Sequence, residues 1–543
     1  MLRSEFAGLM REMLAHFQHL HRLSGSADAE RSVDWLCEQF AARQITVQRK
    51  QCDLLLSDPL VAGLLVDGQM FKAKTRSFSA DCPSGVEAEL YYDARSLTFL
   101  PECDVAAWSE NVRGKLVLAD QGFEDYVQRL MQAGAAGLIH IWGSAETALH
   151  EETVGPVWGT PVPDDCIRYP TLPVISINQQ DGHALLARLK TEPLSGRITT
   201  SVHEHIAPCS LPVVEIAGSD EEFVLLSSHY DSWHEGVTDN ATGNALCFAL
   251  ALHFAGKPLK RGLRIAFWPG HSNARYGGST WYADRYRSLL LRHCVAHVNV
   301  DSPGCIGGSQ LIVNASGAES VTWLNQAITE VTGKPAGRIT PPGKGGDQSF
   351  WGLDIPIHIA LREMPEQRHT LSPGSGGGWW WHTEEDWLDK VDEEYLWRDT
   401  LIHQRWLESL LNDDRLPLDM THCLASVGEA LTQLQGELDP AFSLQPAKIL
   451  LDTLAAEISD SPSDESLRRA VGLWHRARYR ASDDFHPDLS YHGGAFPGLQ
   501  LLRGYRREQC SDRFWLMLET QFIRQRDRLC ELLAESVGVL KRA

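Results

Sequence analysis

Apolar and polar positions divide the chain into segments of different texture. In SADAERSVDWLCEQFAAR, apolar residues recur every three or four positions, so residues 1 to about 45 are predicted to form an entry pair of helices. From about 80 to 205, short β-rich runs such as GKLVLAD precede YVQRLMQAGAAGLIHIW, in which a helix gives way to a buried strand. This texture predicts a small α/β insert.

The segment from 205 to 410 carries the strongest pattern. The apolar runs FVLLSSH, LRIAFW, VAHVNVD and IPIHIAL are separated by helical stretches such as ATGNALCFALALHF. Continuous apolar strands that alternate with helices are typical of a mostly parallel sheet covered on both faces. We therefore expect an α/β fold with a doubly wound sheet here, followed by a helical C-terminal region that contains FWLMLETQFIRQRDRLCELLAESV.

Composition narrows the functional classes. A chain of 543 residues with 43% apolar content predicts two to four domains. The formal charge of -21 and the lack of a long basic run argue against a nucleic-acid partner. The N-terminal residues mix charges at helical spacing, so we expect neither a signal peptide nor a membrane anchor and a cytoplasmic location. The 12 cysteines form no CxxC pair, which predicts neither a disulfide framework nor a thiolate zinc site.

Candidate metal ligands follow the predicted strands. His229 ends FVLLSSH, Asp301 ends VAHVNVD, Asp239 lies in the loop after His229, and His382 begins HTEEDWLDKVD. Ligands of a doubly wound sheet gather at the carboxyl ends of its strands. Two imidazoles and two carboxylates suit zinc or a similar divalent ion, and a shared carboxylate permits one or two ions. Asp231 is expected to orient the ring of His229 by accepting its second proton.

The ordered motifs HYDSW, GVTDNATG, RIAFWPG, NVDSPG, GGDQSFWGLDIP and HTEEDWLDKVD, with HRLSGS near the N-terminus, resemble the M28 metallopeptidase family. GKLVLAD with QAGAAGLIHI resembles its protease-associated insert, and SYHGGAFPGLQLL resembles the dimerisation domain of the glutamate carboxypeptidase II and transferrin receptor group. The resemblance implies a zinc-peptidase-like domain at 1–60 and 205–412, an insert at 61–204 and a helical domain at 413–543. It also implies a homodimer.

The chain departs from this family at one catalytic position. The family has two adjacent glutamates after the FW-x-G strand end, a general base followed by a metal ligand. If the strand end sets the register, this chain has His271 and Ser272 at those positions, whereas a shift of one residue would place His271 differently. Three hypotheses follow. His271 is the general base over one firmly held ion, or His271 is a ligand and Glu384 or Glu385 is the base. In the third hypothesis the chain is a catalytically inactive receptor or scaffold of the transferrin receptor type.

The substrate is less defined than the reaction. A divalent ion that activates water predicts hydrolysis of an amide or peptide bond in a small peptide or an N-acyl amino acid-like substrate. The group's Lys-Tyr pair for a terminal carboxylate is Ser490-Tyr491 here, so preference for an acidic terminal residue is not expected. Arg275, Arg362 and Lys344 are alternative carboxylate anchors, and Arg275, Tyr276 and Tyr491 are predicted to contact substrate. The run Trp379–Trp381 predicts an aromatic wall near the metal.

Overall fold

The computed structural model describes residues 3–94, 102–343, 345–458, 463–482, 486–490 and 494–541. The expected α/β fold with a mostly parallel central sheet is confirmed. Strands β10 (Gly262–Trp268), β9 (Phe223–His229), β11 (Cys294–Asn299) and β14 (Ile357–Met364) run parallel to one another in this spatial order. The sheet continues through β12 (Gln310–Ala315), antiparallel to β14, and β13 (Arg338–Thr340). The parallel strands therefore bring their carboxyl ends to one edge.

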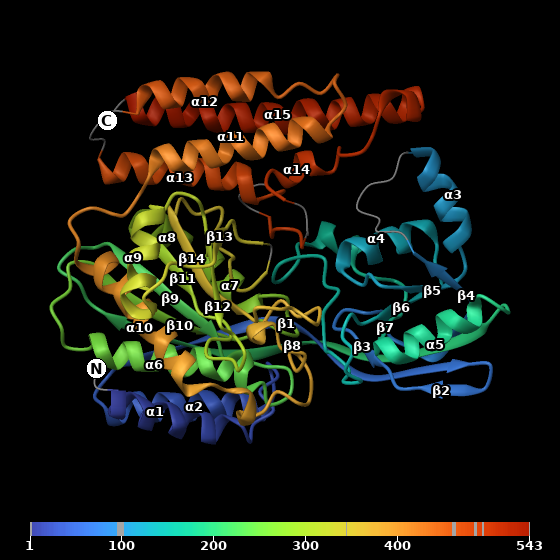
Figure 1. Ribbon diagram of the computed structural model, residues 1–543, viewed down its shortest axis with the longest axis horizontal. Helices are drawn as coiled ribbons and strands as arrows, with labels where there is room; N and C mark the ends of the chain where they lie inside the picture. Colours follow the sequence, from blue (N-terminus) through green and yellow to red (C-terminus); the bar gives the residue numbers. More distant parts are fainter. Residues whose placement is uncertain are drawn as a thin grey trace.

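Helices cover both faces of this sheet (Figure 1). One face packs against α1 (Arg3–Phe17), α2 (Ala27–Ala42), α6 (Thr242–Phe254), α9 (Val321–Thr332) and α10 (Glu393–Asn412). The other face packs against α7 (Gly277–Arg285) and α8 (Arg287–His293). Burial on both faces explains why β9 is buried at every position and reads as one apolar run.

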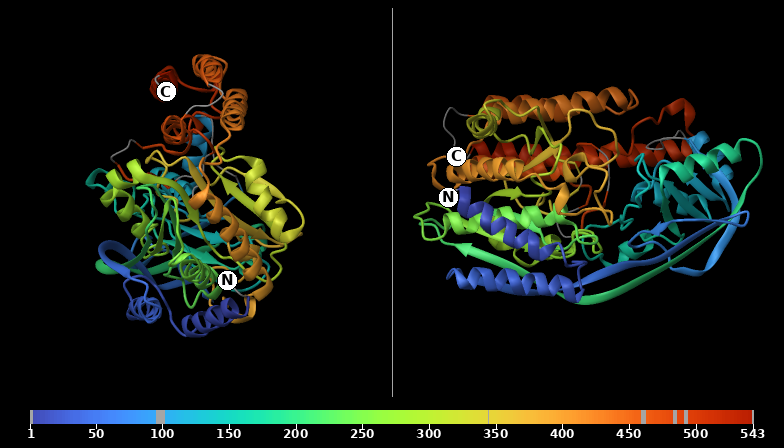
Figure 2. Two further views of the ribbon diagram at one scale, coloured as in Figure 1. Left: turned by 90° about the vertical axis from the view of Figure 1, so that its left-hand side faces the viewer. Right: turned by 60° about the horizontal axis from the view of Figure 1, so that its bottom comes forward.

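A long two-stranded ribbon leads from this sheet to the insert. Strands β1 (Val47–Val66) and β8 (Ser195–Ile216) pair antiparallel along almost their whole length, and β8 contacts β10 at one end and β4 at the other. Figure 2 shows the ribbon crossing the molecule. The insert has the parallel strands β4 (Cys82–Asp93), β5 (Leu116–Ala119), β6 (Gly137–Ile141) and β7 (Val174–Ile177), the short strands β2 (Gln69–Phe71) and β3 (Lys74–Thr75), and the helices α3 (Glu102–Val112), α4 (Glu124–Ala133) and α5 (Gln179–Leu189).

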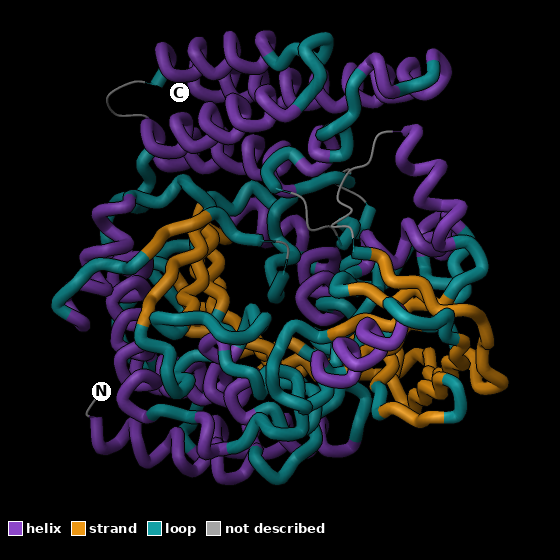
Figure 3. Tube along the Cα trace, turned by 45° about the vertical axis from the view of Figure 1, so that its right-hand side comes forward, coloured by secondary structure: helices purple, strands orange, loops and turns teal. Residues whose placement is uncertain are grey.

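The C-terminal region is helical and has its own core. It contains α11 (Met420–Glu437), α12 (Gln445–Glu457), α13 (Asp464–Tyr479), α14 (Pro497–Gln500) and α15 (Asp512–Lys541). Figures 1 and 3 show these helices lying together over one side of the molecule. A bridge between Val157 and Leu489 joins this region to the insert. Within the described ranges, every helix is too short or too polar to span a membrane.

Arg22, in the segment HRLSGS, ties the N-terminal helices to the loop that follows β9. Its buried guanidinium donates to the backbone carbonyls of Phe17, Tyr230, Glu235 and Gly236 at 2.6 to 3.1 Å. Burial lowers the pKa of Arg22 to about 10, against the opposing effect of nearby carboxylates. Because the carbonyls of Phe17 and Gly236 also accept from backbone N–H groups, loss of this side chain leaves chiefly those of Tyr230 and Glu235 unpaired.

We expect Arg22→Met to lower the free energy of unfolding by about 3 kcal/mol or more, since the unpaired carbonyls stay buried. The denaturation midpoint in urea measures this effect. Arg113→Met, at a side chain that is 59% exposed, is the matched control. Equal midpoints for the two variants would show that Arg22 does not stabilise the loop.

Candidate active site

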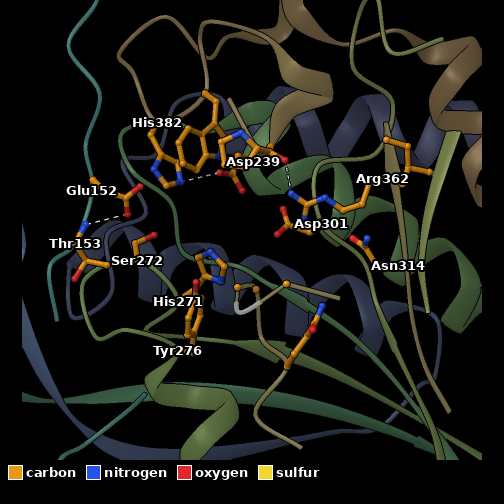
Figure 4. A pocket seen from close by; sticks show the side chains of 18 of the residues that line it. Glu152, Thr153, Asp239, His271, Ser272, Tyr276, Asp301, Asn314, Arg362 and His382 are labelled. Atoms are coloured by element: carbon orange, nitrogen blue, oxygen red, sulfur yellow. Dashed lines mark hydrogen bonds and ion pairs between the residues drawn. The ribbon is translucent and has the colours of Figure 1, made fainter. Parts of the chain in front are cut away.

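Four predicted ligands converge at the carboxyl edge of the central sheet. His229 is the last residue of β9, Asp301 follows β11, and Asp239 lies in the segment Val237–Ala241 that precedes α6. His382 reaches the same place from the loop between β14 and α10. Figure 4 shows Asp239, Asp301 and His382 around one cavity. The topology thus unites residues that are 153 positions apart in the sequence.

The carboxylate of Asp239 lies between two imidazoles. Its Oδ1 atom is 3.1 Å from Nε2 of His229, and its Oδ2 atom is 3.1 Å from Nε2 of His382. Oδ1 of Asp301 is 3.8 Å from the same Nε2 atom of His229. Each oxygen of Asp239 therefore faces a different histidine, which is the arrangement of a carboxylate shared between two cation positions.

The donor atoms fit a divalent cation. Nε2 of His229 and Oδ1 of Asp239 are buried and make no hydrogen bond, although such atoms are normally paired. The opposite ring atoms are occupied, because Nδ1 of His229 bonds the backbone carbonyl of Asp231 and Nδ1 of His382 bonds that of Glu151, both at 2.9 Å. Both Nε2 atoms are thereby aimed into the cavity. The sequence predicts that Asp231 orients the ring of His229, and the backbone carbonyl of Asp231 makes this contact.

The electrostatics of the site also favour a positive charge. Burial alone would lower the pKa of His229, but the carboxylates of Asp231, Asp239 and Asp301 raise it well above its usual value. The same balance raises the pKa of His382 beside Asp239. Several buried carboxylates thus surround the imidazoles, and a bound cation satisfies both sets of groups.

Asp386 holds the loop that carries Asp239. Its Oδ2 atom accepts from the backbone N–H of Asp239 at 3.0 Å, and its Oδ1 atom accepts from the N–H and hydroxyl of Thr238 at 2.9 and 2.7 Å. Burial raises the pKa of Asp386 to about 7. The residue lies in HTEEDWLDKVD, so its motif was recognised in the sequence although its role was not.

His271 lies directly against His229, one of the predicted metal ligands. Its ring stacks on that of His229, with centroids 3.6 Å apart and an angle of 9° between the planes. Its Nδ1 atom is 2.8 Å from Oδ2 of Asp347, a buried carboxylate that also accepts from Ser279. Its ligand atom lies within 4.8 Å of ligand atoms in His229 and Asp301. Asp347, in the motif GGDQSFWGLDIP, was not singled out from the sequence.

The carboxylate of Asp231 holds the loop on which His271 stands. It accepts from the backbone N–H groups of His271 and Ser272 at 3.2 and 3.0 Å. Asp231 therefore contributes twice, since its carbonyl orients His229 and its side chain fixes the neighbouring loop.

Other predicted site residues have different placements. The carboxylate of Glu384 is 70% exposed and pairs with Lys74 at 3.2 Å. Glu385 is also exposed, and neither residue lines the cavity, so the geometry does not support either as a general base. Tyr491 and Lys344 lie outside the described residues.

Arg275 and Tyr276 do line the cavity. The guanidinium of Arg275 is already bound by Glu124 of the insert at 2.7 Å and by the hydroxyl of Ser490 at 2.8 Å. This pairing ties the insert and the C-terminal region to the loop that carries His271, and it argues against the expected role of Arg275 as a substrate anchor. Tyr276 packs between the rings of Trp158 and His271.

The cavity has a volume of about 400 Å³. Its wall includes Trp381 from the tryptophan run, Arg362 as proposed from the sequence, and two further arginines, Arg338 and Arg368. Glu152 lines it from the insert. The sequence does not identify Arg338, Arg368 and Glu152, because no local motif marks them as parts of the site.

Comparisons with known proteins agree with this geometry. The profile described as "Peptidase family M28" matches residues 213–404, which include the four predicted ligands. Leucine aminopeptidase 2 of Trichophyton tonsurans is 24% identical over 372 residues, which are 65% of this chain and 72% of that protein. Leucine aminopeptidase 2 of Trichophyton rubrum is 24% identical over 58% of this chain and 62% of its own length.

Solved structures share the fold. An aminopeptidase from Aneurinibacillus sp. strain AM-1 has a TM-score of 0.59 at 20% identity, with 76% of this chain and 96% of that chain covered. A zinc aminopeptidase from Bacillus subtilis has a TM-score of 0.56 at 17% identity, with 76% and 97% covered. A peptidase M28 precursor from Shewanella amazonensis SB2B has a TM-score of 0.60 at 16% identity, with 77% and 98% covered.

We expect Asp239→Asn to abolish divalent metal binding at this site, because it removes the charge that both imidazoles share. Elemental analysis after dialysis against metal-free buffer measures the content. Asp220→Asn, at an exposed aspartate after β8, is the control. Unchanged metal content in Asp239→Asn would contradict the assignment of the ligands.

Proposed function

We propose that residues 213–404, which match the model of peptidase family M28, form a peptidase domain of that family, and that the protein is a divalent-metal aminopeptidase that removes N-terminal residues from short peptides. The observation that carries this proposal is the buried carboxylate of Asp239 between His229 and His382, at the wall of a cavity large enough for a dipeptide. The similarity to leucine aminopeptidases supports the choice of the N-terminal end.

The chain's own residues have separable roles in this proposal. His229, Asp239 and Asp301 would hold one ion, and Asp239 with His382 would hold a second. When bound, these ions polarise the scissile carbonyl and lower the pKa of the attacking water. Zinc is the metal that these nitrogen and oxygen donors fit best.

Of the two hypotheses for His271, the geometry favours the general base. A ligand holds zinc about 2.0 to 2.1 Å from its nitrogen, in the plane of the imidazole ring. The rings of His229 and His271 are nearly parallel and stacked, so one ion cannot lie in both planes at that distance. His271 and His229 would therefore not ligate the same ion.

Asp347 completes this assignment. It engages Nδ1 of His271 and leaves Nε2 to accept a proton from the attacking water. After the amide bond breaks, the same nitrogen returns that proton to the leaving amine. The histidine thus performs the acid and base work for which the family uses a glutamate.

The outer wall of the cavity is positively charged. Arg338 lies on β13, Arg362 on β14, and Arg368 in the loop that follows β14. Guanidinium groups at this wall favour peptides that carry a carboxylate beyond the cleaved bond. We therefore propose that dipeptides and tripeptides, whose free carboxylate reaches this wall, are better substrates than long chains.

We also propose a domain organisation and an oligomeric state. We assign residues 61–204 to a protease-associated insert and residues 413–543 to a dimerisation region, so that the active protein is a homodimer. The separate core of the C-terminal helices and the exposed apolar side chains of Leu516, Met517 and Ile523 on α15 support this assignment.

A substrate panel tests the activity. We expect turnover of leucyl, alanyl and aspartyl dipeptides with a free N-terminus, and none of the same dipeptides after N-acetylation. Cleavage of the acetylated compounds alone would reverse the polarity and favour a carboxypeptidase or amidase. A protein that holds metal but turns over no member of the panel would favour the receptor or scaffold.

For the base, we expect His271→Ala to lower kcat by about two to four orders of magnitude while metal content stays unchanged. His183→Ala, at an exposed histidine of the insert, is the control. Loss of metal in His271→Ala, with recovery of activity in excess zinc, would instead identify His271 as a ligand.

A further inference from the structure

The two cation positions around Asp239 have unequal sets of donors. On one side, His229 and Asp301 accompany the shared carboxylate. On the other side, the described part of the peptidase domain offers His382 and Asp239. Catalytic zinc sites use three protein ligands, so the position beside His382 lacks one donor. Ser272 lines the cavity there, and its short neutral hydroxyl is a poor substitute for a carboxylate.

A carboxylate from the insert faces this incomplete side. Figure 4 shows Glu152 on the side of the cavity where His382 and Ser272 lie, with its carboxylate turned inward. The carboxylate interacts electrostatically with His382. Among the described residues that line the cavity, the acidic side chains are Asp239, Asp301 and Glu152. Asp239 and Asp301 belong to the cation position beside His229, so Glu152 is the remaining carboxylate.

The backbone fixes Glu152 next to His382. Nδ1 of His382 is 2.9 Å from the carbonyl of Glu151, and the N–H of Glu151 donates to the carbonyl of His382 at 2.8 Å. On the other side, the N–H of Ser77 donates to the carbonyl of Glu152 at 3.1 Å. Hydrogen bonds therefore hold the backbone of Glu151 to His382 and the backbone of Glu152 to Ser77.

Glu151 and Glu152 are turned to different partners. The carboxylate of Glu151 is bound by Lys74 at 2.8 Å and lies 3.2 Å from His234. Oε1 of Glu152 accepts only from the neighbouring N–H of Thr153, at 3.0 Å, among the hydrogen bonds of the described residues. A bond to an adjacent amide is readily exchanged for a bond to a divalent ion, because carboxylates bind zinc strongly.

We propose that Glu152 is the third protein ligand of the ion beside His382, so that the insert completes the metal centre. The inference rests on the proposed function of the site. The side chain of Glu152 leaves the amide of Thr153 and turns toward His382 when the ion binds. This assignment explains how a chain with Ser272 in place of a ligating glutamate retains a second cation position.

The experiment counts ions in purified full-length protein loaded with zinc and dialysed against metal-free buffer. A second group of possible donors, Asp58, His203 and His205 on the β1–β8 ribbon, lies away from the cavity. All variants therefore carry His203→Ala, so that zinc held by this group does not enter the count. Glu146→Gln, at a partly buried glutamate of the same insert, is the matched control.

We expect two ions per chain in the background protein and in Glu146→Gln, and one ion in Glu152→Gln. Adding Ser272→Glu to Glu152→Gln should restore the second ion, because it places a carboxylate on the peptidase-domain side of the same position. A structural role for Glu152 would not produce this rescue.

Two ions in Glu152→Gln would overturn the inference and leave the proposed function intact. A single ion in the background protein that Glu152→Gln does not remove would also overturn it. No ion in any variant, and no turnover, would overturn the proposed function itself.

Discussion

The structure of the active site depends on one buried carboxylate that two imidazoles share. Each oxygen of Asp239 faces a different histidine at 3.1 Å, and burial of an ionised carboxylate is unfavourable unless charges or hydrogen bonds compensate it. His229 and His382 come from segments far apart in sequence, so the fold must hold the end of β9 next to the loop that precedes α10. The position of Asp239 therefore determines which other residues can take part.

Other side chains hold Asp239 and the loops around it in place. Asp386 fixes the backbone of Asp239, and Arg22 fixes the carbonyls of the preceding loop. Asp231 holds the loop with His271 and Ser272, while Arg275 links that loop to Glu124 in the insert. Each contact joins elements that are distant in sequence. The insert and the C-terminal region are thus parts of the active site's support.

The sequence predicted the central sheet and the convergence of four candidate metal ligands because both follow from local patterns. Apolar runs define the strands, and His229 and Asp301 lie where those runs end, so topology alone brings them together. Contacts between distant segments were not predictable in the same way. The pairing of Arg275 with Glu124 spans 151 positions, and it replaced the expected role in substrate binding. Glu152 was missed for the same reason, since HEETVGP carries no ligand spacing. Proximity to His382 in sequence predicts Glu384 and Glu385 as candidate bases, but consecutive residues of a turn point in different directions, and both side chains are exposed.

The shared carboxylate is tested most directly by a crystal structure of the zinc-loaded protein with anomalous scattering measured at the zinc edge. We expect two zinc peaks that flank Asp239, one bound also by His229 and Asp301 and the other by His382. Zinc bound without Asp239, or no zinc peak in the cavity, would contradict it.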